Sequence, residues 1–139
     1  MARWRILVAD TNRAMTELRG VLDGQEVEVF NAVSYEKAVD EAKSWRPHLC
    51  VVGYHFDEAR PYRLVTHLRA ESWASDIPIL IVRALPLFVV EKEDTDELRA
   101  SYRSLGASDY LSFHAAMERH GKDAALRNFR DAVIRYLQG

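Results

Sequence analysis

Residues 47–56 read PHLCVVGYHF, an apolar run that follows a proline and continues to Gly53. A short continuous run of this kind is typical of a strand that is buried on both faces of a sheet. In α/β proteins, ligands and chemistry collect where such strands end. Gly53 offers no side chain at that place, so the rest of the chain must indicate whether a reactive site exists.

Similar apolar runs alternate with amphipathic segments along the chain. We expect strands at residues 4–10, 26–33, 48–54, 77–82 and 109–113, and helices at 11–24, 34–45, 60–71, 95–107 and 122–138. Because each crossover between parallel strands needs a helix, this alternation predicts one α/β domain over residues 1–139, a doubly wound parallel sheet with helices on both faces. In the last two helices, Leu105 and Ile134 are among the residues expected to face inward.

Composition argues against several classes of protein. The formal net charge is −2, from 19 basic and 21 acidic side chains, which provides no overall field for nucleic acid or an anionic membrane. The single cysteine, Cys50, lies inside an apolar run, so we expect a buried, inert thiol and a reducing compartment. The N-terminus lacks the apolar region of a signal peptide, and the longest apolar stretch, residues 77–90, is interrupted by Arg83 and two prolines. The sequence therefore predicts a soluble, cytoplasmic protein.

Four segments resemble the receiver domain of two-component response regulators: ILVAD at 6–10, RPHLCVVG at 46–53, IPILIV at 77–82 and GASDYLS at 106–112. The segment LGASDYL is the most specific, since it is similar to the family's Gly-Ala-x-x-Tyr before a lysine. The interval of 30 residues from Gly53 to Arg83 also matches the family's interval from phosphoacceptor to Thr/Ser. The resemblance covers essentially the whole chain. It implies a CheY-like (flavodoxin-like) sheet of strand order 2-1-3-4-5 and a role in phosphorelay signal transduction.

The residues that the resemblance places in the phosphorylation pocket depart from the family pattern. Receivers use paired acids to hold Mg²⁺, an aspartate nucleophile, a hydroxyl residue and a lysine. At the corresponding positions this chain has Ala9 beside Asp10, then Gly53, Arg83 and Phe113. We therefore expect a degenerate receiver, or pseudo-receiver, with no metal, no cofactor, no phosphorylation at Gly53 and no enzymatic activity.

Several alternatives remain for these positions. Arg83 is expected either to pair with Asp10 or to point to solvent, and beside a vacated pocket it would suit an anionic ligand. His55 and Asp57 are candidate displaced phosphoacceptors, although each is explained more simply as a loop or helix-cap residue. The altered pocket therefore also allows a small-ligand or anion sensor.

The resemblance makes Tyr110 the family's switch aromatic. It also implies a partner surface formed by the helix at 95–107, the strand at 109–113 and the terminal helix, including Tyr102, Arg103 and Tyr110. The apolar segment 85–90 is expected to border this surface. We expect a protein partner there, either another signalling protein or a second copy in a homodimer, and neither nucleic acid nor membrane.

Overall fold

A computed structural model describes residues 4–11, 22, 27–83, 95–112 and 119–139. Three predictions fall outside this part of the chain. They are nearly all of the expected helix at 11–24, the apolar segment 85–90, and Phe113.

Five parallel strands form one sheet: β1 (Trp4–Ala9), β2 (Val27–Ala32), β3 (Leu49–Gly53), β4 (Ile79–Arg83) and β5 (Asp109–Ser112). Their order across the sheet is β2-β1-β3-β4-β5, so the predicted fold class and strand order are confirmed. All five residues of β3 and of β4 are buried, as expected for strands that are covered on both faces.

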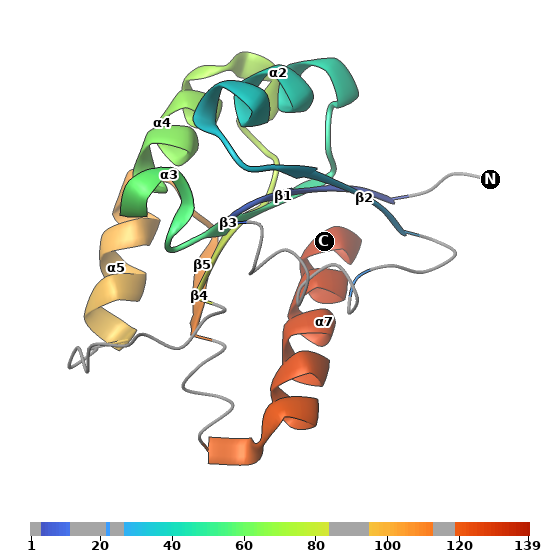
Figure 1. The fold of residues 1–139 in the computed structure, drawn as a ribbon, viewed down its shortest axis with the longest axis vertical. Helices are drawn as coiled ribbons and strands as arrows, with labels where there is room; N and C mark the ends of the chain where they lie inside the picture. The colour runs from blue at the N-terminus through green and yellow to red at the C-terminus, as the bar shows by residue number, and fades with distance from the viewer. Residues whose placement is uncertain (1–3, 12–21, 23–26, 84–94, 113–118) are drawn as a thin grey trace.

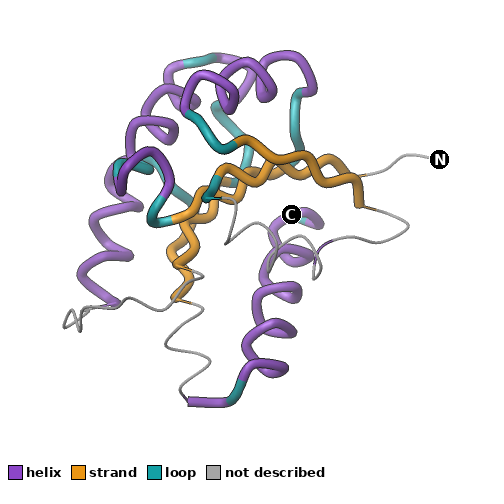
Figure 2. Tube along the Cα trace, in the orientation of Figure 1, coloured by secondary structure: helices purple, strands orange, loops and turns teal. Residues whose placement is uncertain are grey.

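Helices lie on both faces of this sheet (Figures 1 and 2). One face carries α2 (Tyr35–Trp45), α4 (Tyr62–Ala70) and α5 (Thr95–Leu105), and the other carries α7 (Lys122–Gln138). Two short elements were not predicted, the four-residue α3 (Phe56–Ala59) and the 3-10 turn η1 (Ser72–Ala74).

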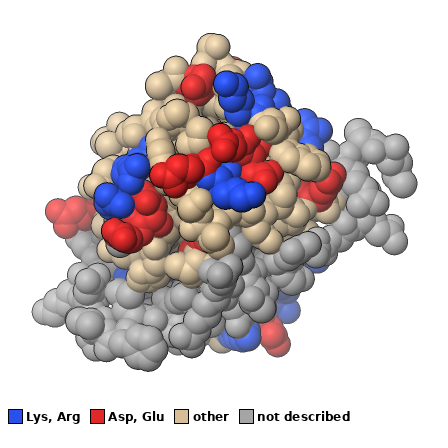
Figure 3. All heavy atoms as spheres, turned by 45° about the horizontal axis from the view of Figure 1, so that its top comes forward, with Lys and Arg blue, Asp and Glu red and all other residues tan. Residues whose placement is uncertain are grey.

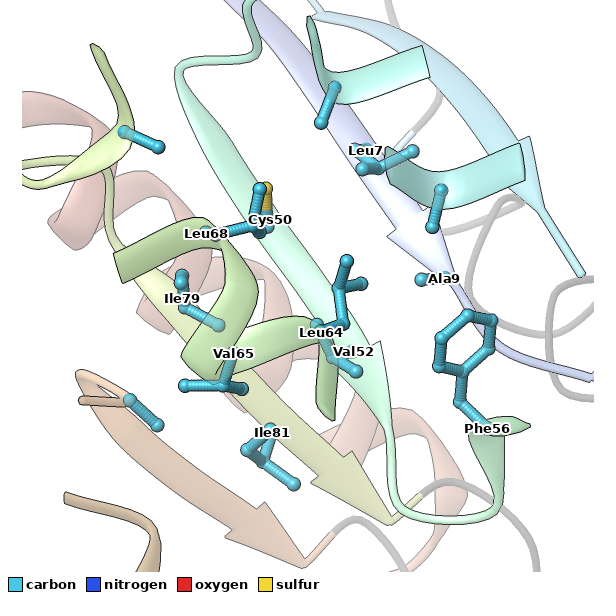
Figure 4. Packing of buried hydrophobic residues seen from close by; sticks show 14 of the residues in the cluster. Leu7, Ala9, Cys50, Val52, Phe56, Leu64, Val65, Leu68, Ile79 and Ile81 are labelled. Carbon is cyan, nitrogen blue, oxygen red and sulfur yellow. The ribbon is translucent and has the colours of Figure 1, made fainter. Parts of the chain in front are cut away.

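The buried side chains form two clusters, one on each face of the sheet. The cluster beneath α2 and α4 contains Leu7, Cys50, Leu64, Val65, Leu68 and Ile79 (Figure 4), and the cluster beneath α7 contains Ile6, Val8, Leu49, Phe129 and Val133. The prediction that Leu105 and Ile134 face inward is wrong. Leu105, in the last turn of α5, is 41% exposed, and Ile134 is 37% exposed because it follows Val133 by 100° around the helix.

Arg69, near the end of α4, fixes the start of β4 and the turn before β5. Its guanidinium donates hydrogen bonds to the carbonyl oxygens of Gly106 (2.7 Å), Ile77 (2.7 Å) and Ala74 (2.9 Å). Gly106 has a φ of 115°, and a Cβ there would lie 2.7 Å from Cγ of Arg69. This close approach explains why the segment GASDY begins with glycine.

Candidate functional site

The predicted pocket residues that the structure describes meet at the carboxyl edge of the sheet because the strands are parallel. In the strand register Ala9 lies beside Val52, and Gly53 lies beside Val82, so Asp10, Gly53 and Arg83 follow one another along this edge. The backbone N–H of Tyr54 donates to the carbonyl oxygen of Val82 at 2.9 Å, which extends the pairing one residue beyond Gly53.

The carboxyl group of Asp10 occupies the space above Gly53. A Cβ built on Gly53 would overlap Cγ, Oδ1 and Oδ2 of Asp10. Asp10 is only 2% exposed, and its Oδ1 accepts a hydrogen bond from the backbone N–H of Thr11 at 2.8 Å. The neighbouring acid therefore fills the place that a side chain at position 53 would take.

Burial controls the charge of Asp10. It raises the pKa of this carboxyl group from 3.8 to about 7, and the hydrogen bond from Thr11 has a smaller, opposite effect. Near neutral pH the group therefore exists in both protonation states.

Arg83 is buried (3% exposed), and its guanidinium lies 5.3 Å from the centre of the Tyr54 ring. Among the ion pairs between described residues, none joins Asp10 to Arg83. Of the two predicted alternatives for Arg83, the pair with Asp10 is not formed, and the buried side chain does not point to solvent either. The carboxylate lies over Gly53, and the guanidinium is directed to an aromatic face.

Phe56 was missed by sequence reasoning. It is 1% exposed and belongs to the same hydrophobic cluster as Ala9, and Figure 4 shows its ring directed toward Ala9. The small side chain of Ala9 and the large ring of Phe56 thus belong to one hydrophobic cluster at the place where the resemblance expects a metal-binding acid. The sequence signal that could have indicated this packing was the aromatic residue three positions after Gly53, together with alanine at position 9.

The two candidate displaced acceptors have structural partners. The carboxylate of Asp57 pairs with Arg63 at 2.9 Å and with Arg60 at 3.4 Å, and its side chain is 12% exposed. Asp57 and Glu58 have φ values of 56° and 58°, so these ion pairs hold a turn with two consecutive left-handed residues. The ring of His55 contacts the Tyr54 ring edge-on, with 5.1 Å between the ring centres.

The structure does not bring together a group of metal ligands in the part of the chain it describes. There, no three His, Cys, Asp or Glu residues are placed to hold a metal ion.

The predicted switch aromatic is buried. Tyr110 has no exposed surface, and its ring stacks on the ring of Tyr102 with 5.6 Å between centres and 16° between planes. Tyr102 is itself 9% exposed, whereas the Arg103 side chain is 54% exposed. Of the three residues named for the predicted partner surface, Arg103 is therefore the exposed one, whereas Tyr102 and Tyr110 are buried.

Several solved structures with a similar fold are response regulators or their receiver domains. A protein from Chloroflexus aurantiacus J-10-fl described as a response regulator is 20% identical, with a TM-score of 0.76 and coverage of 99% of each chain. The receiver domain of the Francisella response regulator 1452 is 16% identical, with a TM-score of 0.73 and coverage of 98% of each chain. The chemotaxis response regulator CheY4 of Vibrio cholerae is 16% identical, with a TM-score of 0.70, and the match covers 94% of this chain and 98% of that one.

The chain therefore has the fold of the CheY-like receiver domains. No protein-family model matches the sequence, and no curated protein matches it either. At these identities the likeness establishes the fold, and the function must be argued from the residues themselves.

Proposed function

We propose that this chain is a receiver-like signalling module that works without phosphorylation at position 53 and acts through protein contacts. The observation that carries the proposal is the Asp10 carboxyl group in the space above Gly53. A conventional receiver needs that space for the aspartate that accepts the phosphoryl group. Here the strand ends in glycine and has no nucleophile at position 53, and the space is occupied by a neighbouring side chain.

The surroundings of this carboxyl group support the same proposal. Mg²⁺ prefers several oxygen ligands, whereas the Ala9 position offers a buried methyl group in the same hydrophobic cluster as Phe56. Asp10 remains as a single acid, so we propose that the pocket holds no metal or other cofactor, and that the chain is not an enzyme. The occupied space also favours protein contact over a ligand sensor.

We place the contact surface on α5, β5 and α7. The exposed Arg103 lies near the end of α5, on the side of the helix that contacts Asp109 of β5. The proposed partner is a signalling protein or a second copy of this chain.

Charge argues against nucleic acid as the partner. On the face viewed in Figure 3, acidic and basic side chains lie next to one another, and neither sign forms a continuous patch. None of the described helices is long and apolar enough to cross a membrane. The single cysteine of the chain is a free, buried thiol, and unpaired thiols suit a reducing compartment. We therefore propose a cytoplasmic location for the chain.

Incubation with acetyl phosphate and Mg²⁺, followed by intact-mass measurement, tests the proposal. A conventional receiver domain treated in parallel is the positive control and should gain one phosphoryl group. We expect no adduct on this chain. A stable adduct would contradict the proposal, and its loss in Asp57→Asn but not in Asp10→Asn would locate a displaced acceptor.

A further inference from the structure

Asp109 connects three elements through one carboxylate. It is the first residue of β5 and is 9% exposed. Its Oδ1 accepts hydrogen bonds from Arg99 Nε at 3.0 Å and from Arg103 Nη2 at 3.4 Å, both on α5. Its Oδ2 accepts a hydrogen bond from the Tyr136 hydroxyl on α7 at 3.2 Å. We call these four residues the Asp109 clasp.

The clasp reaches around the edge of the sheet. β5 is the last strand in the order, and α5 and α7 lie on opposite faces, so one carboxylate joins both helical layers (Figure 1). The clasp also binds the backbone of this edge strand. Oδ1 of Asp109 accepts from the Tyr110 N–H at 2.8 Å, and Arg99 Nη2 donates to the Tyr110 carbonyl oxygen at 3.3 Å. Such contacts use backbone groups that a bare sheet edge leaves unpaired.

The charges within the clasp support each other. Two guanidinium groups face one carboxylate, and charge-assisted hydrogen bonds of this kind are stronger than neutral ones. Burial raises the pKa of the Tyr136 hydroxyl, and the charge of Asp109 and its hydrogen bond act in the same direction, against smaller opposing effects of Arg103 and Arg135. The hydroxyl therefore stays protonated and remains a donor to Asp109.

We propose that the Asp109 clasp is a conformational device that holds α5 and α7 in one position on β5 and keeps Tyr110 buried beneath Tyr102. Opening the clasp would free the two helices to move and would change the shape of the α5–β5–α7 surface. The regulatory meaning of this change rests on the proposed function, which makes that surface the contact site. The clasp itself does not depend on any partner.

Hydrogen exchange measured by mass spectrometry on Asp109→Asn tests the proposal. Asparagine keeps an acceptor for the Tyr110 N–H but lacks the negative charge that faces the two arginines. We expect exchange in β5 and in the last turns of α5 and α7 to become about tenfold faster or more, while β1, β2 and β3 remain as in the parent.

Asp96→Asn is the matched control. Asp96 is 95% exposed, and its Oδ1 lies 3.6 Å from the same Arg99, but the contact stays within α5. Removing it should leave exchange in β5 and α7 unchanged. Equal effects of the two variants, no change in Asp109→Asn, or uniformly faster exchange in all strands would overturn the proposal.

Tyr136→Phe covers the case in which Asp109→Asn fails to fold. It removes one hydroxyl and retains the ring, so exchange should rise in α7 and β5 and less in α5. Unchanged exchange in α7 would overturn the clasp. These readouts use the free protein, so a failed clasp is distinguishable from a failed signalling proposal, which the acetyl phosphate experiment decides separately.

Discussion

Replacing Asp10 with asparagine tests whether a buried acid destabilises this fold at neutral pH. Asparagine keeps the size of the side chain and an Oδ1 that accepts from Thr11 N–H, at 2.8 Å in the parent. It cannot ionise. Since Asp10 is 2% exposed and burial raises its pKa to about 7, the substitution removes the cost of a buried charge.

The sign of the effect follows from proton binding. The unfolded carboxyl group ionises near its ordinary pKa of 3.8, whereas the folded one keeps its proton until about pH 7. Between these values the folded state binds more protons, so the free energy of unfolding falls as pH rises. The favourable contribution is complete below 3.8 and is lost through about 7, a total of ~4 kcal/mol at about 1.4 kcal/mol per pH unit.

Denaturant unfolding at several pH values between about 4 and 8 measures this quantity. The stability of Asp10→Asn relative to the parent should increase by about 4 kcal/mol from the acidic to the basic end. Asp40→Asn makes the same chemical change at an exposed position on α2 and should follow the parent. A constant difference between Asp10→Asn and the parent over this range would refute the reasoning.

Two further predictions concern β3. Gly53→Ala should lower the free energy of unfolding by about 1–3 kcal/mol, because the added Cβ would overlap the Asp10 carboxyl group. In a double-mutant cycle, the same substitution should cost much less when Asp10 is already alanine. Equal losses in the two backgrounds would disprove the contact. Cys50 is 1% exposed, and burial raises its pKa to about 12, so at about pH 8 its thiolate fraction is about a thousandfold below that of a free thiol. A thiol reagent that forms a coloured product should react in denaturant but not with the native protein, and fast native reaction would contradict this burial.

The parts of the fold that sequence could predict are those set by local pattern. The strand at β3 and the inner face of α4, with Leu64, Val65 and Leu68, follow from apolar periodicity, and both are confirmed. Apolar periodicity predicted burial incorrectly at the end of α5. Leu105 is the last residue of this helix and is exposed. The same pattern does not say how far along a helix the packing against the sheet extends.

The site was less predictable because its contacts join residues far apart in the sequence. The pocket positions Asp10, Gly53 and Arg83 were expected at one edge, and the strand register places them there. The direction of each side chain was not predictable, and neither alternative considered for Arg83, a pair with Asp10 or exposure to solvent, is found. For the same reason, the structural roles of Phe56 and Asp109 were not predicted, because their partners are set only by the three-dimensional fold.

The unusual residues of the pocket form matched pairs, and this bears on whether the site has decayed or been rebuilt. A reactive site that simply lost its side chains would leave voids, and voids in a packed interior are destabilising. At this edge, instead, Phe56 packs toward Ala9, and the Asp10 carboxyl group fills the space above Gly53. The space beside Gly53 is therefore filled by a neighbouring side chain, and Ala9 lies within a packed hydrophobic cluster. An aspartate introduced at position 53 alone would place a second carboxyl group against Asp10, so we expect that one substitution does not create a phosphorylation site. The packing at this edge is consistent with a structural role for these residues.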